Sequence, residues 1–480
     1  MKRYTLLSFT LAFLLFGLIL WLKPFGISDN ASKVLSVAAL MIFLWVSDAL
    51  PMPVVALFPL IFFPLMGISS IEDAAQPYAN PIIFLFMGGF LIGLAIEKWG
   101  LHKRIALNIV NITGTSGNRI ILGFILATGF LSMWLSNTAT TMMMYPIAMS
   151  VVMVMEDKHQ GSGNIRNMAI CLLLAIAYSS NFGGIATIIG TPPNVAFVAF
   201  MEKKYQYSFS FADWMMLCLP LSVILMFSLY WVMTRLLYRN GMKADGETSK
   251  LIKENLLALG KISKPEKRVL FVFILTASLW ILRDLINKAQ SWAKLDDTTI
   301  ALFGALLLFI LPSNSKRSSD RLLQWEDTKK MAWGILILFG GGISMANQLE
   351  KAGLIQQLGN FVATYAGSNM LLLILTITII SIFISEMMSN VAQVIVFAPV
   401  VAGIADAIHI DPLLLGIPMT LGASCAGMLP MGTPPNAIVF ASGKLKLSDM
   451  IKTGFIMNIL STILITLFCY YLTPLLVSDI

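Results

Sequence analysis

The residues of this sequence that are best suited to bind ions fall in a pair of short motifs that occurs twice. The first pair is Ser136-Asn137-Thr138 with Gly190-Thr191-Pro192-Pro193-Asn194, and the second is Ser389-Asn390-Val391 with Gly432-Thr433-Pro434-Pro435-Asn436. All four stretches lie inside apolar segments. In a bilayer core, a backbone group freed from a helix needs a partner inside the protein or in a water-filled cavity. Such interruptions therefore indicate a function.

The chemistry of these motifs suits a small cation and an anion together. Two successive prolines remove two backbone donors and leave carbonyl groups without helical partners. Free carbonyls, together with Asn, Ser and Thr oxygens, are hard ligands for a small cation. The helix that restarts after the break directs unpaired N–H groups toward the same place, where an anion is stabilised.

The composition of the chain identifies the environment of these motifs. Of its 480 residues, 57% are hydrophobic and 12% are charged, and apolar runs of nearly twenty residues recur throughout. These features predict an all-α polytopic membrane protein. The net charge of +8 is explained by Lys and Arg in loops on one side of the membrane, so no nucleic-acid partner is expected. The four cysteines stand singly in apolar contexts and are expected to be packed thiols.

Hydropathy and helix-breaking residues predict about 11 transmembrane helices. The first, 5–22, lacks a small-residue cleavage site and is interpreted as a retained span rather than a signal peptide. An amphipathic interfacial stretch is expected at 98–112. The other expected spans and hairpins are 33–49, 51–67, 81–97, 117–155, 168–202, 211–237, 268–288, 297–312, 331–349, 367–408, 412–442 and 450–475.

The chain is predicted to consist of two inverted repeats of five spans each. After a first span and lead-in (1–32), repeat 1 (33–237) holds a re-entrant hairpin at 117–155 and a broken span at 168–202. A cytoplasmic linker (238–267) leads to repeat 2 (268–480), with a hairpin at 367–408 and a broken span at 412–442. The spacing Ser132-x-x-x-Ser136-Asn137 recurs as Ser385-x-x-x-Ser389-Asn390. Because each copy crosses the membrane an odd number of times, the two are inverted relative to each other.

The basic residues predict the orientation of the chain. With a cytoplasmic N-terminus and an extracytoplasmic C-terminus, the loops 98–104, 156–167, 238–267 and 313–330 all lie in the cytoplasm, in agreement with their Lys and Arg content. The protein is therefore expected to be a multi-pass protein of the cell inner (plasma) membrane.

These motifs resemble the divalent anion:sodium symporter family, which includes dicarboxylate and citrate carriers. The most specific stretch is Leu429-Pro430-Met431-Gly432-Thr433-Pro434-Pro435-Asn436-Ala437-Ile438-Val439-Phe440, and the resemblance covers nearly the whole chain. It implies an elevator-type transporter and a homodimer, in which hairpins and broken spans move as a unit against a fixed scaffold. It also implies sodium ions as the only cofactors, with no organic cofactor.

The resemblance further implies two sodium sites and one substrate site. The first sodium site would use Ser132, Ser136, Asn137 and a carbonyl near Gly190, and the second Ser385, Asn390, the carbonyl of Met388 and one near Gly432. The substrate would lie between the hairpin tips, against Ser136, Asn137, Thr138, Thr191, Pro192, Ser389, Asn390, Val391, Thr433 and Pro434.

The residue types agree with a dianionic substrate. Two similar Ser-Asn tips can each offer hydroxyl and amide donors to one end of a linear molecule. No Arg or Lys occurs in the motifs, so bound cations and helix ends must compensate the two carboxylate charges. Val391 replaces the hydroxyl of Thr138 and makes the second tip drier than the first.

The sequence therefore predicts a sodium-coupled carrier that imports C4-type dicarboxylates such as succinate, malate and fumarate, and not an enzyme. A sodium-independent dicarboxylate exchanger and a citrate or sulfate carrier are the alternatives within the transporter class. An intramembrane enzyme is disfavoured because no metal-binding or nucleophile motif is present, and no phosphate-binding loop of an ATP-driven pump occurs. Glu386, beside the second tip, could either handle a proton or cation or anchor the hairpin.

Overall fold

The computed structural model describes residues 3–47, 49–114, 116–158, 163–207, 209–239, 246–290, 294–313, 321–365 and 369–477. Their regular secondary structure is helical, and a single isolated bridge pairs Pro312 with Arg321. Eight helices of these ranges are long and apolar enough to cross a membrane, and shorter apolar helices accompany them. The prediction of an all-α polytopic membrane protein is confirmed, whereas the count of about 11 spans stays a prediction.

The N-terminal part of the chain begins with α1 and α2, which pack side by side. The expected span at 51–67 consists of two helices rather than one. The first ends at Val55, and the second begins at Phe58 with Pro59 in its first turn, where a missing backbone N–H is tolerated. The elements of this part are α1 (Arg3–Leu22), α2 (Asp29–Val46), α3 (Met52–Val55), α4 (Phe58–Leu65), α5 (Ile71–Ala75) and α6 (Pro81–Lys98).

The amphipathic stretch forms a separate helix because Gly100, with φ +71°, turns the chain after α6. The helices of the first expected hairpin and broken span follow, and they are interrupted after Ser132 and after Gly184. These elements are α7 (Leu101–Thr113), α8 (Gly117–Ser132), α9 (Asn137–Lys158), α10 (Gly163–Gly184), α11 (Pro192–Tyr205) and α12 (Phe211–Trp231).

The predicted linker contains a helix that packs on α7 and α9, while residues 240–245 lie outside the described ranges, as do 314–320 of the loop at 313–330. The helices of the second expected hairpin and broken span are interrupted after Ser385 and after Ala423. The remaining elements are α13 (Gly246–Ala258), α14 (Lys264–Ala289), α15 (Asp297–Ile310), α16 (Trp333–Lys351), α17 (Leu354–Tyr365), α18 (Met370–Ser385), α19 (Asn390–Ala407), α20 (Leu413–Ala423), α21 (Pro434–Phe440) and α22 (Leu447–Val477).

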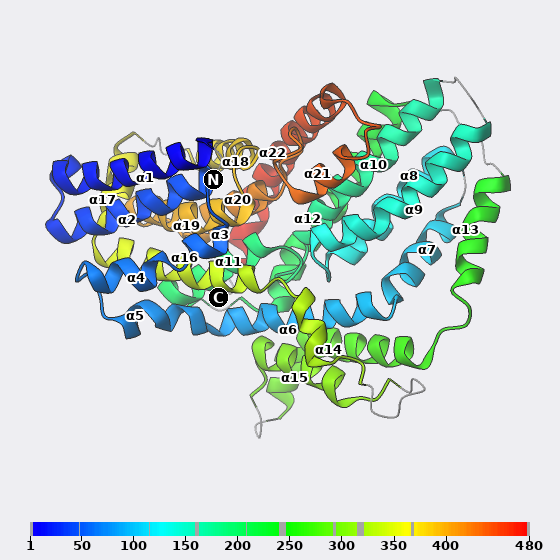
Figure 1. Ribbon diagram of the computed structural model, residues 1–480, viewed down its shortest axis with the longest axis horizontal. Helices are drawn as coiled ribbons and strands as arrows, with labels where there is room; N and C mark the ends of the chain where they lie inside the picture. The colour runs from blue at the N-terminus through cyan, green and yellow to red at the C-terminus, as the bar shows by residue number, and fades with distance from the viewer. Residues whose placement is uncertain are drawn as a thin grey trace.

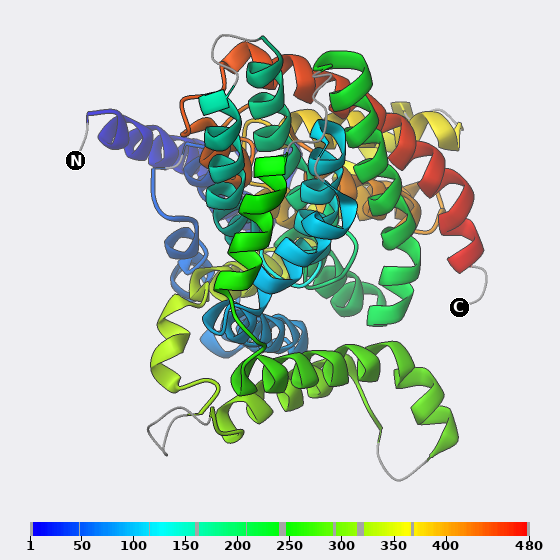
Figure 2. The ribbon, with the colours of Figure 1, turned by 90° about the vertical axis from the view of Figure 1, so that its right-hand side faces the viewer.

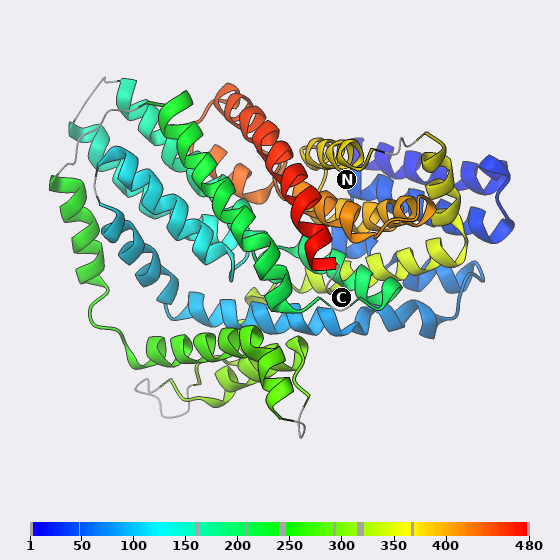
Figure 3. The same ribbon diagram turned by 180° about the vertical axis from the view of Figure 1, so that it is seen from behind.

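The two hairpins lie toward opposite ends of the elongated molecule. Helices α8 and α9 extend toward the end occupied by α7 and α13, whereas α18 and α19 lie toward α1, α2 and α17 (Figure 1). Helices α14 and α15 run below α6 and pack against it (Figure 2). On the other side, α12 and α22 pack against each other and cover the broken spans (Figure 3).

Glycines permit the closest of these helix contacts. A Cβ atom added to Gly88 would lie 2.7 Å from the Cβ of Ala301 in α15, and one added to Gly341 would overlap the backbone of Ala56. A Cβ atom on Gly183 of α10 would overlap the backbone of Gly129 in α8. Gly88-Gly89 and Gly340-Gly341-Gly342 therefore lie at close packing surfaces.

Contacts between loops form two separate groups, and the first contains the four basic loops. Lys98 pairs with Asp327 (2.6 Å), and Arg104 pairs with Glu266 (2.8 Å). Near the start of α10, Arg166 pairs with Asp449, and Asn167 donates to the carbonyl of Arg239. Each of these contacts joins loops that the sequence places on the same side of the membrane.

The second group joins helix ends that the sequence places on the opposite side. Lys204 and Tyr205, at the end of α11, both contact Asp406 at the end of α19, at 3.0 and 2.8 Å. The backbone N–H of Phe211 donates to Asp297 (2.7 Å). No hydrogen bond or ion pair among the described residues contradicts the predicted sidedness of the loops mentioned here.

The contact between α8 and α10 predicts a stability difference between two glycine variants. Gly183→Ala should lower the thermal stability of the detergent-purified protein, because a new methyl group meets backbone atoms of Gly129 that cannot move easily. Overpacking of this kind costs about 1–3 kcal/mol. Gly17→Ala is the control, because its Cβ meets nothing within 4 Å. Equal melting temperatures for the two variants would contradict this packing.

Candidate functional site

The first hairpin reverses at a short tip. Helix α8 ends at Ser132 and α9 begins at Asn137, so Ser136 of the predicted motif lies in the turn between them and Asn137 and Thr138 begin α9. The Ser132 hydroxyl donates to Asn137 Oδ1 (2.8 Å), which joins the two ends of the turn. The Ser136 hydroxyl faces the first turn of α9 and accepts from the N–H of Ala139 (3.2 Å). Thr138, like Ser136 and Asn137, is half-buried.

The break of the first broken span surrounds this tip. Gly190 is so close that a Cβ atom there would lie 3.0 Å from the carbonyl oxygen of Ser132 and overlap that of Gly184. A Cβ atom on Gly184 would in turn overlap Asn137 Oδ1. Ser132, Asn137 and Gly190, predicted together, are thus brought together, and Gly184 joins them. The side chain of Ser136 is turned toward Ala139 and toward a cavity of about 90 Å³ that Glu97 and Lys330 also line.

The side-chain amide of Asn137 can be placed in two orientations, and the second satisfies more of its neighbours. In one, Oδ1 accepts from Ser132 and Nδ2 donates to Asn181 Oδ1 (3.3 Å). In the other, the nitrogen takes the place of the oxygen and donates to the carbonyls of Ser180 (3.1 Å) and Gly190 (3.3 Å). The first orientation holds the amide oxygen against two carbonyl oxygens, which repel it unless a cation lies among them.

The second tip repeats the geometry of the first. Helix α18 ends at Ser385 and α19 begins at Asn390, and the Ser385 hydroxyl donates to Asn390 Oδ1 (2.7 Å). The same hydroxyl also contacts the carbonyl of Ala423 in the second broken span. Met388 and Ser389 form the turn, and both are half-buried. Ser385 and Asn390, which the sequence analysis assigned to one sodium site, therefore lie in contact.

Gly432, predicted beside this second tip, lies against Glu386. A Cβ atom on Gly432 would be 2.9 Å from Glu386 Oε2 and 3.3 Å from the carbonyl oxygen of Leu429. The described contacts of Gly432 therefore involve the neighbour of Ser385 rather than Asn390.

The asparagine that ends each Gly-Thr-Pro-Pro-Asn motif closes its helix break. Asn194 Nδ2 donates to the carbonyls of Thr187 (2.9 Å) and Gly184 (3.4 Å), and Asn436 Nδ2 donates to those of Leu429 (3.1 Å) and Ala426 (3.4 Å). In both copies the acceptors precede the asparagine by seven and ten residues. The two breaks are thus braced in the same way, which satisfies carbonyls left free where the helix is interrupted.

Asn181 connects the two halves of the candidate site, although the motifs did not single it out. It lies in α10, is 2% exposed, and donates from Nδ2 to the Thr433 hydroxyl (3.2 Å) in addition to its contact with Asn137. Thr433 also accepts from the N–H of Asn436 (3.4 Å), which caps α21. The signal in the sequence is the run Ser179-Ser180-Asn181, three polar residues inside a buried apolar helix.

The predicted substrate residues form two neighbourhoods. The first tip and its helix α9 lie next to α21 and Thr433. Helix α11 begins at the half-buried Pro192, directly after the buried Thr191, and packs against α19 of the second hairpin. Val391 is half-buried and packs against the hydrophobic core, while Pro434 is exposed. No hydrogen bond joins the two tips within the described ranges.

Glu386 is held by four donors. Its carboxylate accepts from the backbone N–H groups of Gly427 (2.8 Å), Met428 (2.7 Å) and Leu429 (2.9 Å) and from the amide of Asn458 (2.8 Å). The side chain is 3% exposed. Of the two roles considered for this residue, the geometry favours that of a structural anchor. The carboxylate accepts hydrogen bonds from N–H groups that the second break leaves without helical partners.

Helical hairpins whose tips meet broken helices, inside an all-helical membrane protein, define a polytopic membrane protein of the transporter class. The chain belongs to the family of the sodium:sulfate symporter transmembrane region, whose model matches residues 2–478.

Similar proteins support this assignment over nearly the whole length. The chain is 39% identical over 473 residues to the sodium-dependent dicarboxylate transporter SdcS of Staphylococcus saprophyticus, covering 98% of this chain and 90% of that protein. It is 38% identical to SdcS of Staphylococcus aureus over 462 residues, which is 95% of this chain and 89% of the relative. The crystal structure of the Alcanivorax borkumensis YdaH transporter, described as having an unusual topology, matches with a TM-score of 0.60 and 14% identity, covering 97% of this chain and 98% of that one. This last likeness concerns the fold alone.

The anchoring of Glu386 predicts different effects of two substitutions. Glu386→Ala should lower the thermal stability strongly, because each buried N–H left without a partner costs about 1–3 kcal/mol. Glu386→Gln keeps one oxygen acceptor and should be intermediate. Melting temperatures by fluorescence-detected size-exclusion chromatography test this order. A stable Glu386→Ala protein whose only change is an altered pH dependence of transport would instead support proton handling.

Proposed function

We propose that this protein is a sodium-coupled secondary transporter that imports C4-type dicarboxylates, such as succinate, malate and fumarate, across the cell inner membrane. The family and the two SdcS relatives, which carry the name sodium-dependent dicarboxylate transporter, support both the coupling ion and the substrate class. A sodium-independent exchange and citrate or sulfate as substrate are the alternatives that the experiments below distinguish.

The observation that carries the sodium coupling is the set of oxygens around the first tip. Asn137 Oδ1 lies 2.8 Å from the Ser132 hydroxyl, and the carbonyls of Ser180 (3.1 Å) and Gly190 (3.3 Å) face the same end of the amide. Oxygen donors of this kind are those that suit Na⁺. At the second tip, Ser385, Asn390 and the carbonyl of Ala423 supply a similar set. Each tip would hold one Na⁺.

The anion would bind next to these cations. Helices α9 and α19 begin at Asn137 and Asn390, so their first N–H groups face the tips and favour negative charge. Because the motifs contain no Arg or Lys, the two Na⁺ ions would supply the positive charge that a dianion needs. Substrate binding would then depend on Na⁺, which couples the two fluxes.

The same proposal includes the two inverted repeats, a cytoplasmic N-terminus, an extracytoplasmic C-terminus, a homodimer and an elevator movement. The grouping of loop contacts into two sets supports the topology. The packing supports two bodies: α12 and α22 contact the hairpins and broken spans, whereas α14 and α15 contact α6. The first group would be the moving unit and the second part of the scaffold.

Substitution of the tip asparagines tests the function. Asn137→Ala and Asn390→Ala should each abolish Na⁺-dependent uptake of labelled succinate into cells, because each change removes an oxygen ligand and a link between the hairpin helices. The protein should still insert, as surface expression would show. Asn108→Ala, an exposed asparagine on α7, is the control and should transport normally. Unchanged uptake by both tip variants at matched expression would refute the proposed sites.

A further inference from the structure

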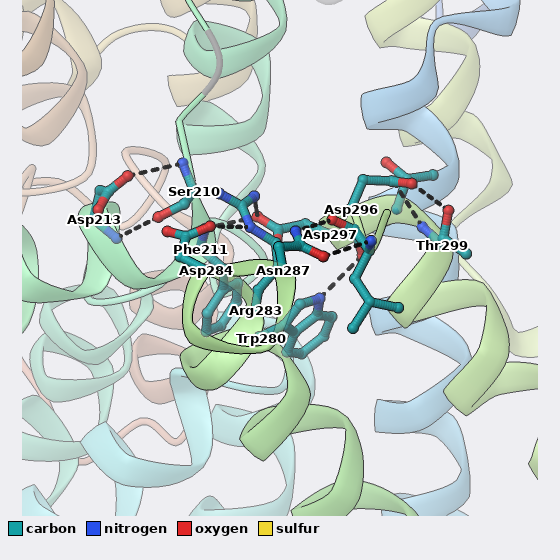
Figure 4. Close-up of polar contacts among 12 residues, drawn as sticks. Ser210, Phe211, Asp213, Trp280, Arg283, Asp284, Asn287, Asp296, Asp297 and Thr299 are labelled. Carbon is teal, nitrogen blue, oxygen red and sulfur yellow. Dashed lines mark hydrogen bonds and ion pairs between the residues drawn. The ribbon is translucent and has the colours of Figure 1, made fainter. Parts of the chain in front are cut away.

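The start of α12 is fastened to helices α14 and α15 by a buried ionic contact. Asp297 Oδ2 accepts from the backbone N–H of Phe211 (2.7 Å) and lies 3.2 Å from Arg283 Nη1 (Figure 4). Asp297 is 7% exposed. The contact joins three elements at one point: the first residue of α12, the last turns of α14 and the first turn of α15.

Aromatic stacking surrounds this ionic contact and reaches the first hairpin tip. The ring of Phe211 stacks on Trp280 of α14 (centroids 4.5 Å apart, planes at 14°) and on Trp134 (5.9 Å, 22°). The indole N–H of Trp280 donates to the carbonyl of Asp297 (3.0 Å). Trp134 stands two residues before Ser136 in the tip. Phe211 therefore connects the tip to α14 and α15 through a continuous stack.

The charge of Asp297 is stabilised best when both of its partners, the Phe211 N–H and Arg283, are in place. Arg283 is shared with Asp284 (2.8 Å), and Asp297 Oδ1 has no hydrogen-bond partner among the described residues. The two other nearby acidic side chains are occupied locally, since Asp213 caps α12 with Ser210 and Asp296 caps α15 with Thr299. If α12 moved away, Asp297 would lose the Phe211 N–H and remain a buried carboxylate with one fewer partner. A partly separated contact is therefore unfavourable, and the contact is expected to have two states, closed and open.

We propose that Phe211, Arg283 and Asp297 form a latch that holds the moving unit against α14 and α15 in the conformation of this structure, and that the latch opens in every transport cycle. Arg283 and Asp297 are then positioning residues: they act on the equilibrium between conformations and do not touch the substrate. This inference rests on the proposed function, because it requires α12 to move relative to α14 and α15.

A reversible cross-link tests whether the latch opens. The four native cysteines are buried and free and would first be replaced by Ala. In that background, Phe211→Cys with Asp297→Cys is joined by a short, reducible bis-thiosulfonate reagent. The cross-link should lower Na⁺-dependent succinate uptake by about tenfold or more, since gating movements limit turnover, and reduction should restore it. Full uptake by the cross-linked protein would overturn the proposal.

The matched control is a pair of cysteines in α14 and in the segment just before α15. The side chain of Asn287 and the backbone of Leu295 exchange two hydrogen bonds (2.8 and 2.9 Å), so Asn287→Cys with Leu295→Cys can be linked by the same reagent. Uptake should be unaffected, because both residues belong to the same body. Equal inhibition by the two cross-links would also overturn the latch.

A second measurement needs no transport and so separates failure of the latch from failure of the proposed function. A single Phe211→Cys, at a position that is fully buried when the latch is closed, is labelled with a membrane-impermeant thiol reagent. Adding Asp297→Asn should raise the labelling rate about tenfold, as expected for loss of a charge-assisted hydrogen bond. Equal labelling rates with Asp and Asn at position 297 would refute the latch whatever the protein transports. Absence of Na⁺-dependent uptake in the Cys-free parent, with faster labelling retained, would refute only the proposed function.

Discussion

The structure depends on how two helices can be interrupted inside an apolar core without leaving backbone groups unpaired. The prolines of the two Gly-Thr-Pro-Pro-Asn motifs interrupt the helices. The side-chain amides of Asn194 and Asn436 each donate hydrogen bonds to the carbonyls seven and ten residues earlier. Because these carbonyls are held in place, others at the same breaks can face the hairpin tips. The interrupted helices therefore present carbonyl oxygens at fixed positions near the hairpin tips.

The two copies achieve this in different ways, and the difference matters for the site. At the first break, the Thr187 hydroxyl links the hairpin carbonyl of Met133 to the N–H of Gly190. At the second, the charged side chain of Glu386 binds three successive N–H groups. A carboxylate in this place cancels positive charge near the second tip, whereas the described hydrogen bonds that brace the first break involve no carboxylate. Two similar oxygen sets therefore lie in different electrostatic surroundings.

Much of the fold and part of the site could be predicted from the sequence. The helices, hairpins and breaks follow from apolar runs and prolines, and Ser132 and Asn137 meet because only a short turn separates them. The division of 51–67 into α3 and α4 was missed because hydropathy outweighed Pro59. Asn181, the anchoring of Glu386 and the contact of Phe211 with Asp297 join segments far apart in the chain, so only the packing of the helices reveals them.

The central claim is that sodium ions held at the tips make dicarboxylate binding possible. The most direct test is counterflow of labelled succinate into proteoliposomes preloaded with unlabelled succinate, with Na⁺ or with an equal concentration of choline on both sides. Counterflow removes the driving force of a gradient, so only the need for bound Na⁺ is measured. Rapid accumulation in Na⁺ and none in choline is the result that this account predicts. Equal accumulation in the two media would contradict it and identify a sodium-independent exchanger.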